Sequence, residues 1–137
     1  MKIRGMKGKA GPLSVIAPSK KWILDNLRVR HKEFLGRLAG PYTLIFEKKE
    51  KVFLRECSRR TLGVRIPRGK FTKIIRKAGV PFVTTSVNIS GHRPITRLSE
   101  IPKGLLKDVD FAIDAGVLSN PSSIIYDLTG ETPKRVR

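Results

Sequence analysis

The chain has 137 residues, 39% of them hydrophobic, which is enough for one globular domain with a single core. Lysine and arginine total 29 against 11 acidic residues, and this formal charge of +18 favours a polyanionic partner, RNA first, over a surface merely solubilised by lysine. No apolar run approaches the roughly 20 residues that cross a bilayer, which excludes a membrane partner. The one cysteine excludes an internal disulfide and, without a secretory leader, indicates a cytoplasmic protein.

The first half of the chain predicts short strands with two helices among them. Apolar, β-branched runs bounded by Gly, Pro or charged turns predict the strands, and Ser19 is the expected N-cap of the first helix. In chain order the elements are a strand at Pro12–Ala17, a helix after Ser19 that buries Trp22, Ile23 and Leu27, a helix at Lys32–Leu38, and strands at Thr43–Glu47, Lys51–Glu56 and Leu62–Ile66. The second and third of these strands are expected to form a hairpin across a charged tight turn.

The second half continues the alternation of helices and strands. Phe71, Ile74, Ile75 and Ala78 recur at helical spacing, and Gly79 is the expected C-cap. The remaining elements are a strand at Val80–Thr85, a weaker helix at Leu98–Leu106 with Pro102 near its start, strands at Val109–Ile113 and Ser123–Leu128, and a short β-like piece at Arg135–Arg137. Together they predict a twisted open mixed α/β sheet with flanking helices, in one domain over residues 1–137.

A run of hydroxyl and amide side chains from Thr84 to Gly91, TTSVNISG, follows directly on an apolar strand. Short side chains let backbone N–H groups approach an anion, and Ser and Asn add donors of their own. Open α/β sheets usually bind ligands at the carboxyl ends of their strands. The run is therefore suited to a phosphate or a ribose, although the same residues are also the ordinary composition of turns.

Three further segments place polar side chains at strand ends. Thr61 and Arg65 lie four residues apart on one predicted strand, and this spacing turns both side chains to the same face. Ser123 opens another strand, and Arg137 follows the last β-like piece. At the other end of the chain, Lys2 and Arg4 lead into a turn rich in glycine and lysine.

In this order the segments resemble the YrdC family of threonylcarbamoyl-AMP synthases. The resemblance is carried by six elements along nearly the whole chain, of which TS-x-N-x-SG after G-V-P is the most diagnostic. The elements are K-x-R (Lys2, Arg4), P-L-S-V (Pro12–Val15), G-P-x-T (Gly40, Pro41, Thr43), T-x-x-x-R-x-P (Thr61, Arg65, Pro67), TS-x-N-x-SG (Thr85, Ser86, Asn88, Ser90, Gly91) and S-x-x-x-D (Ser123, Asp127).

The resemblance implies a twisted α/β sheet whose basic cleft uses ATP, L-threonine and bicarbonate to make threonylcarbamoyl-AMP and pyrophosphate for tRNA modification. It implies that Mg²⁺ is shared by the phosphate oxygens, with no metal site made by protein alone. It assigns catalytic contacts with the triphosphate to Lys2 and Arg4. It also implies a set of binding residues: Thr61, Ser86, Asn88 and Arg137 for ATP, and Arg65, Thr84 and Ser123 for threonine.

The sequence departs from the family pattern at its start. Relatives usually begin with P-T-x-T-x-Y-G-L, which is missing here, so we expect an N-terminally shortened domain with weak ATP binding and little turnover. The spacer Gly5–Gly11 is also longer than usual, which makes Lys7 and Lys9 an alternative cation pair. Two other interpretations stay open: a non-catalytic module that binds tRNA or double-stranded RNA, and a fragment completed by a partner chain that supplies the missing segment.

Overall fold

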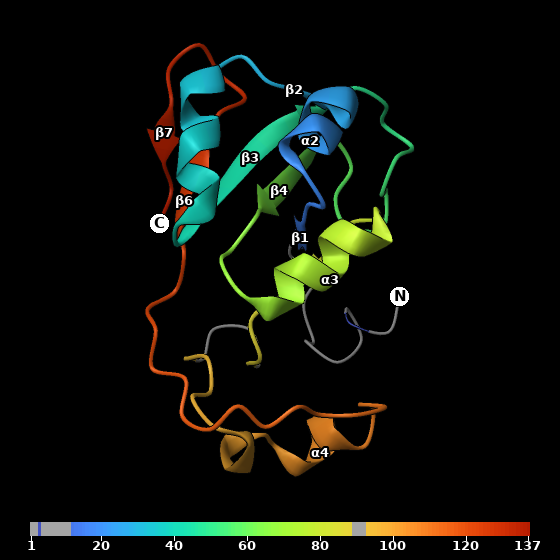
Figure 1. Cartoon of the computed structure of the whole chain (residues 1–137), viewed down its shortest axis with the longest axis vertical. Coiled ribbons are helices and arrows are strands. Elements are labelled where there is room, and N and C mark those ends of the chain that lie inside the picture. Colours follow the sequence, from blue (N-terminus) through green and yellow to red (C-terminus); the bar gives the residue numbers. More distant parts are fainter. Residues whose placement is uncertain (1–2, 4–11, 89–92) are drawn as a thin grey trace. The chain divides into compact units, whose positions relative to one another are not determined.

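The computed structural model describes residue 3, residues 12–88 and residues 93–137, which belong to two compact units (Figure 1). The larger unit combines Pro12–Thr85 with Ser122–Arg137 and holds the whole β-sheet. The smaller unit combines Met1–Gly11 with Ser86–Pro121. In the described part of the chain, no helix has both the length and the apolar character needed to span a membrane.

The sheet of the larger unit is mixed, as the sequence predicted. Its strands run in the order β5-β1-β4-β3-β6-β7, and β2 pairs with β3 as well. The pairs β1–β4 and β3–β6 are parallel, and the other pairs are antiparallel. The strands are β1 (Ser14–Ile16), β2 (Leu27–Arg28), β3 (Tyr42–Lys48), β4 (Thr61–Arg65), β5 (Phe82–Thr84), β6 (Ile124–Asp127) and β7 (Lys134–Arg135).

Three helices pack on one face of this sheet, in front of the strands in Figure 1. They are α2 (Lys20–Asn26), the 3₁₀ helix η1 (Lys32–Ala39) and α3 (Lys70–Ala78), all close to their predicted bounds. Alternate residues of each strand point to the helix-covered face, and this face is apolar and buried. Its core includes Val15, Leu44, Phe46, Leu62 and Val64 from the sheet and Ile23, Leu38 and Ile75 from the helices.

Ser19 caps α2 as predicted, because its side-chain oxygen accepts a hydrogen bond from the backbone N–H of Trp22 at 3.0 Å. We expect Ser19→Ala to lower the free energy of unfolding by about 1 kcal/mol, since one N–H of the first turn loses its acceptor. Urea unfolding measures this difference. Ser122→Ala is the matched control at an exposed serine, and an equal loss in both variants would contradict the capping role.

The predicted strand at Lys51–Glu56 is wrong: residues 51–57 form turns, and β4 is the antiparallel partner of β3. These turns surround Lys48, a residue that is only 3% exposed although lysine is normally a surface residue. Its Nζ donates hydrogen bonds to the carbonyl oxygens of Lys51 at 3.1 Å and of Phe53 and Ser58 at 2.7 Å each. These bonds curl the backbone around one ammonium group and take its carbonyls away from strand pairing.

The smaller unit is described here by itself. The helix predicted at Leu98–Leu106 is divided into the 3₁₀ turn η2 (Leu98–Glu100) and the short helix α4 (Lys103–Leu106), because Pro102 lacks a backbone N–H and interrupts the ladder. The strand predicted at Val109–Ile113 is wrong, since no described residue pairs with it. Its pattern alternates, but a strand needs a neighbour to accept its backbone hydrogen bonds.

Candidate ligand-binding face of the sheet

The face of the sheet opposite the helices carries the polar side chains of the candidate site. Along β4, Leu62 and Val64 are buried under the helices, whereas Thr61, Gly63 and Arg65 alternate with them and point to the other side. This arrangement confirms that Thr61 and Arg65 share one face. We call this side of the larger unit the open face, because no helix of that unit's described residues covers it.

Ser14 and Thr84 meet on the open face from neighbouring strands. They are directly opposite each other in the antiparallel pair β1–β5. The two hydroxyl oxygens lie 3.3 Å apart, and the Ser14 hydroxyl also lies 3.3 Å from the Thr84 carbonyl oxygen, to which it can donate. Both side chains are half-buried, so their hydroxyls form a polar pair that keeps hydrogen-bonding capacity for a ligand.

Gly63 of β4 lets the two flanking strands, β1 and β3, bring hydroxyl residues close to it. A Cβ at this position would lie 3.3 Å from Cγ2 of Thr43 and 3.4 Å from Cβ of Ser14, so any larger side chain would push these neighbours apart. Sequence reasoning did not assign site roles to Ser14 or Thr43. Both lie within matched motifs, P-L-S-V and G-P-x-T, and that position was the one signal that could have indicated them.

Arg65 contributes a positive charge that is not neutralised by the described residues. Its Nε is buried, and no described residue accepts a hydrogen bond from it. Burial lowers the pKa of this guanidinium from its usual value, because the charged form loses hydration. A partly desolvated guanidinium with a free N–H is a strong binding group for a carboxylate or a phosphate.

Ser123 and Arg137 are brought together at the edge of the sheet where β6 and β7 lie. The Nε of Arg137 donates to the carbonyl oxygen of Ser123 at 3.2 Å. The backbone of Ile125 also pairs with Val136 and Arg137, so the β-like piece predicted at Arg135–Arg137 does extend along β6. Ser123 is half-buried, whereas the Arg137 side chain is exposed.

Two other predicted residues, Ser86 and Asn88, belong to the smaller unit. The Ser86 hydroxyl donates to Oδ1 of Asn88 at 2.6 Å. The expected catalytic pair Lys2 and Arg4, and the alternative pair Lys7 and Lys9, lie outside the described residues.

Residues 12–88 and 93–137 bring together no group of three or more His, Cys, Asp or Glu side chains that could hold a metal ion.

The fold and the open face define an α/β protein with a mixed sheet. Among the described residues, the uncovered side presents hydroxyl groups and one unpaired arginine.

The profile of the Sua5/YciO/YrdC family, described as telomere recombination, matches residues 1–137. The chain belongs to this family.

A protein of Methanocaldococcus jannaschii that is provisionally named threonylcarbamoyl-AMP synthase is 43% identical over 120 residues. The match covers 83% of this chain and 56% of that protein, so the chain spans little more than half the length of this relative.

Solved structures show the same fold. The crystal structure of YciO from Escherichia coli has a TM-score of 0.79 at 26% identity, over 99% of this chain and 70% of YciO. Sua5 from P. abyssi, solved as a complex with L-threonine, has a TM-score of 0.82 at 24% identity, over 99% of this chain and 43% of Sua5.

Proposed function

We propose that this chain provides the substrate-binding sheet of a threonylcarbamoyl-AMP synthase. The observation that carries the proposal is the buried Nε of Arg65, which has no acceptor among the described residues and lies on the same face as the Ser14–Thr84 hydroxyl pair. An amino acid with a hydroxyl side chain offers a carboxylate for the guanidinium and a hydroxyl for the pair. Threonine is the amino acid that the provisional name of the M. jannaschii relative contains.

The proposed reaction proceeds in two steps. The amino group of threonine adds to bicarbonate and water leaves, which gives a carbamate. A carbamate oxygen then attacks the α-phosphorus of ATP, the bond to the β-phosphate breaks, and pyrophosphate leaves. The second step transfers no proton, so the protein contributes by aligning the reactants and by neutralising charge.

The residue roles in this proposal divide the site between the two substrates. Arg65 holds the threonine carboxylate with help from Thr84 and Ser123, and we add Ser14 to this group because its hydroxyl lies beside that of Thr84. Thr61 is four residues away from Arg65 on the same face, roughly 13 Å along the strand, which leaves room for a second substrate. We assign ATP binding to Thr61, Ser86, Asn88 and Arg137, and contacts with the triphosphate to Lys2 and Arg4. The product of the reaction is then used to modify tRNA.

The test is pyrophosphate release by the purified chain with ATP, L-threonine and bicarbonate, each omitted in turn. We expect release that requires all three substrates together, and no release when D-threonine replaces L-threonine. Release that continues without threonine would identify simple hydrolysis of ATP and contradict the proposal. Titration calorimetry with L-threonine alone reports on the amino-acid site even where turnover is slow.

A further inference from the structure

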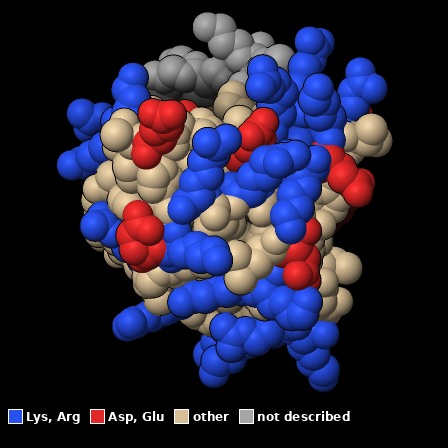
Figure 2. All heavy atoms as spheres, turned by 90° about the horizontal axis from the view of Figure 1, so that it is seen from above, with Lys and Arg blue, Asp and Glu red and all other residues tan. Residues whose placement is uncertain are grey.

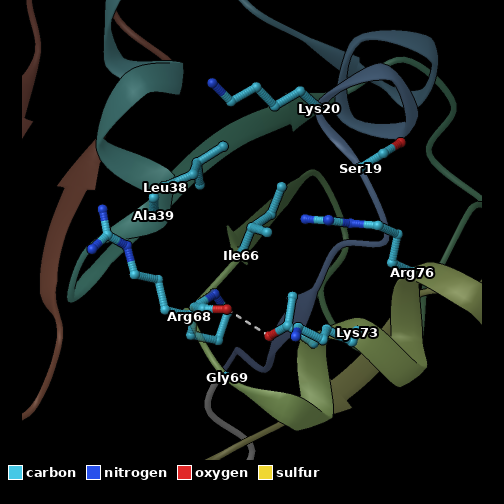
Figure 3. A pocket seen from close by; sticks show the side chains of 11 residues that line it. Ser19, Lys20, Leu38, Ala39, Ile66, Arg68, Gly69, Lys73 and Arg76 are labelled. Atoms are coloured by element: carbon cyan, nitrogen blue, oxygen red, sulfur yellow. Dashed lines mark hydrogen bonds between the residues drawn. The ribbon is translucent and has the colours of Figure 1, made fainter.

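A second candidate site lies on the helix-covered side of the sheet, away from the open face. It is a pocket of about 530 Å³ in the larger unit, bounded by the start of α2, the end of η1, residues 66–69 and one side of α3 (Figure 3). The lining includes buried residues such as Leu38 and Thr72. Thr72 fixes the rim, because its hydroxyl donates to the carbonyl oxygen of Pro67 at 2.6 Å.

The charged residues that line this pocket are all positive. The lining contains Lys20, Arg68, Lys73 and Arg76 and no acidic residue. None of the four side chains forms an ion pair with a described residue, whereas Lys21, Arg60 and Arg97 each have an acidic partner. In Figure 3, Arg76 extends from α3 toward Ile66, and Arg68 extends on the other side toward Ala39; both residues line the pocket. Four cations without a counter-charge favour binding of an anion.

Helix stability does not explain the position of these charges. Lys70 and Lys73 lie in the first turn of α3, which contains no acidic residue. Cations in the first turn are unfavourable, because the N-terminal end of a helix already carries partial positive charge. Arg76 and Lys77 in the last turn are placed favourably. Helix stability therefore explains the position of only these two of the four cations on α3.

The row of cations continues beyond the pocket. Lys70, Lys73, Arg76 and Lys77 recur three and four residues apart, which places them along one side of α3. The sequence contains no Asp or Glu between Glu56 and Glu100, so no acidic residue of this stretch interrupts the row. On the surface shown in Figure 2, Lys and Arg cover wide areas, and acidic side chains lie singly among them. An extended row matches a chain of linked phosphates better than one phosphate group.

We propose that this pocket and the adjoining side of α3 form a binding site for the phosphate backbone of RNA. Arginine forks and lysine ammonium groups contact phosphate oxygens without reading bases, so the site binds RNA of any sequence. Ile66 faces the helices, whereas the neighbouring Arg65 points to the open face, so this site and the proposed threonine site lie on opposite sides of the sheet.

The test measures fluorescence anisotropy of a short labelled RNA across a series of salt concentrations, without ATP or threonine. The double variant Lys73→Glu/Arg76→Glu is compared with Lys51→Glu/Arg55→Glu, which makes the same charge change at exposed turn residues. We expect the pocket variant to lose at least about tenfold in affinity and about two units in the slope of log K against log salt, with a much smaller change in the control.

Every outcome decides the proposal. Equal losses in both double variants would show a general charge effect and overturn the site, as would RNA binding that is unchanged in the pocket variant. Loss of ATP binding with RNA binding retained would identify a nucleotide pocket instead. Lys73→Gln/Arg76→Gln, checked by circular dichroism, provides a milder variant if charge reversal prevents folding. Because no threonine or ATP is present in the RNA titration, its failure leaves the proposed synthase function untouched.

Discussion

Replacing Arg65 by methionine will reduce the affinity for L-threonine by about 10- to 100-fold, while the folded chain stays as stable as before or becomes more stable. The loss in affinity corresponds to the charge-assisted hydrogen bonds between a guanidinium and a carboxylate, worth about 1.5–3 kcal/mol. The gain in stability has a separate cause. The Nε of Arg65 is buried without an acceptor among the described residues, and burial lowers the pKa of the group, so folding desolvates the charge without compensation there.

Two measurements separate this result from general damage. Calorimetry gives the affinity for L-threonine, and urea unfolding gives the free energy of unfolding of the same preparations. Arg59→Met is the matched control, because Arg59 is exposed. A variant Arg65→Met that binds threonine normally would remove Arg65 from the site. A variant that is clearly destabilised would indicate a structural role for this arginine.

Replacing Lys48 by methionine will lower the free energy of unfolding by about 2–4 kcal/mol. Methionine retains the apolar length of the lysine side chain, but it cannot donate to the carbonyl oxygens of Lys51, Phe53 and Ser58. Burial lowers the pKa of Lys48, and the nearby Cys57 acts in the opposite direction, so the ammonium group is held in place against a cost of desolvation. Loss of the donors leaves that turn segment without its organising contact.

The control for Lys48→Met is Lys51→Met, which removes an exposed ammonium group from the same segment and should change stability by less than about 0.5 kcal/mol. Urea unfolding measures both variants, and hydrogen exchange of residues 49–60 locates the effect. Similar small changes in the two variants would mean that water replaces the Lys48 contacts without loss.

Local patterns were sufficient for much of the fold. Ser19 was identified as an N-cap from its position before an apolar helical pattern, and Gly79 as the C-cap, where φ is +71°. The common face of Thr61 and Arg65 followed from strand alternation. Such inferences succeed because each depends only on residues that lie a few positions apart in the sequence.

Predictions failed where a distant or buried contact overrode the local pattern. Lys51–Glu56 has the composition of a strand, but the ammonium group of Lys48 binds its carbonyls, and a buried lysine is not expected from sequence. Val109–Ile113 alternates like a strand, yet it has no pairing partner among the described residues. In both cases the backbone hydrogen bonds determine the outcome, and the sequence does not show where they go.

The sequence by itself determined the family, the mixed α/β class and the strand that bears Thr61 and Arg65, because motifs and periodicity are local. Only the tertiary structure decided which hydroxyls meet and where charge collects. Ser14 and Thr84 are 70 residues apart and touch because β1 and β5 are neighbours in the sheet. The basic pocket likewise combines cations from α2, residues 66–69 and α3. Contacts between such distant segments arise from the order of strands and the packing of helices, and no local pattern encodes them.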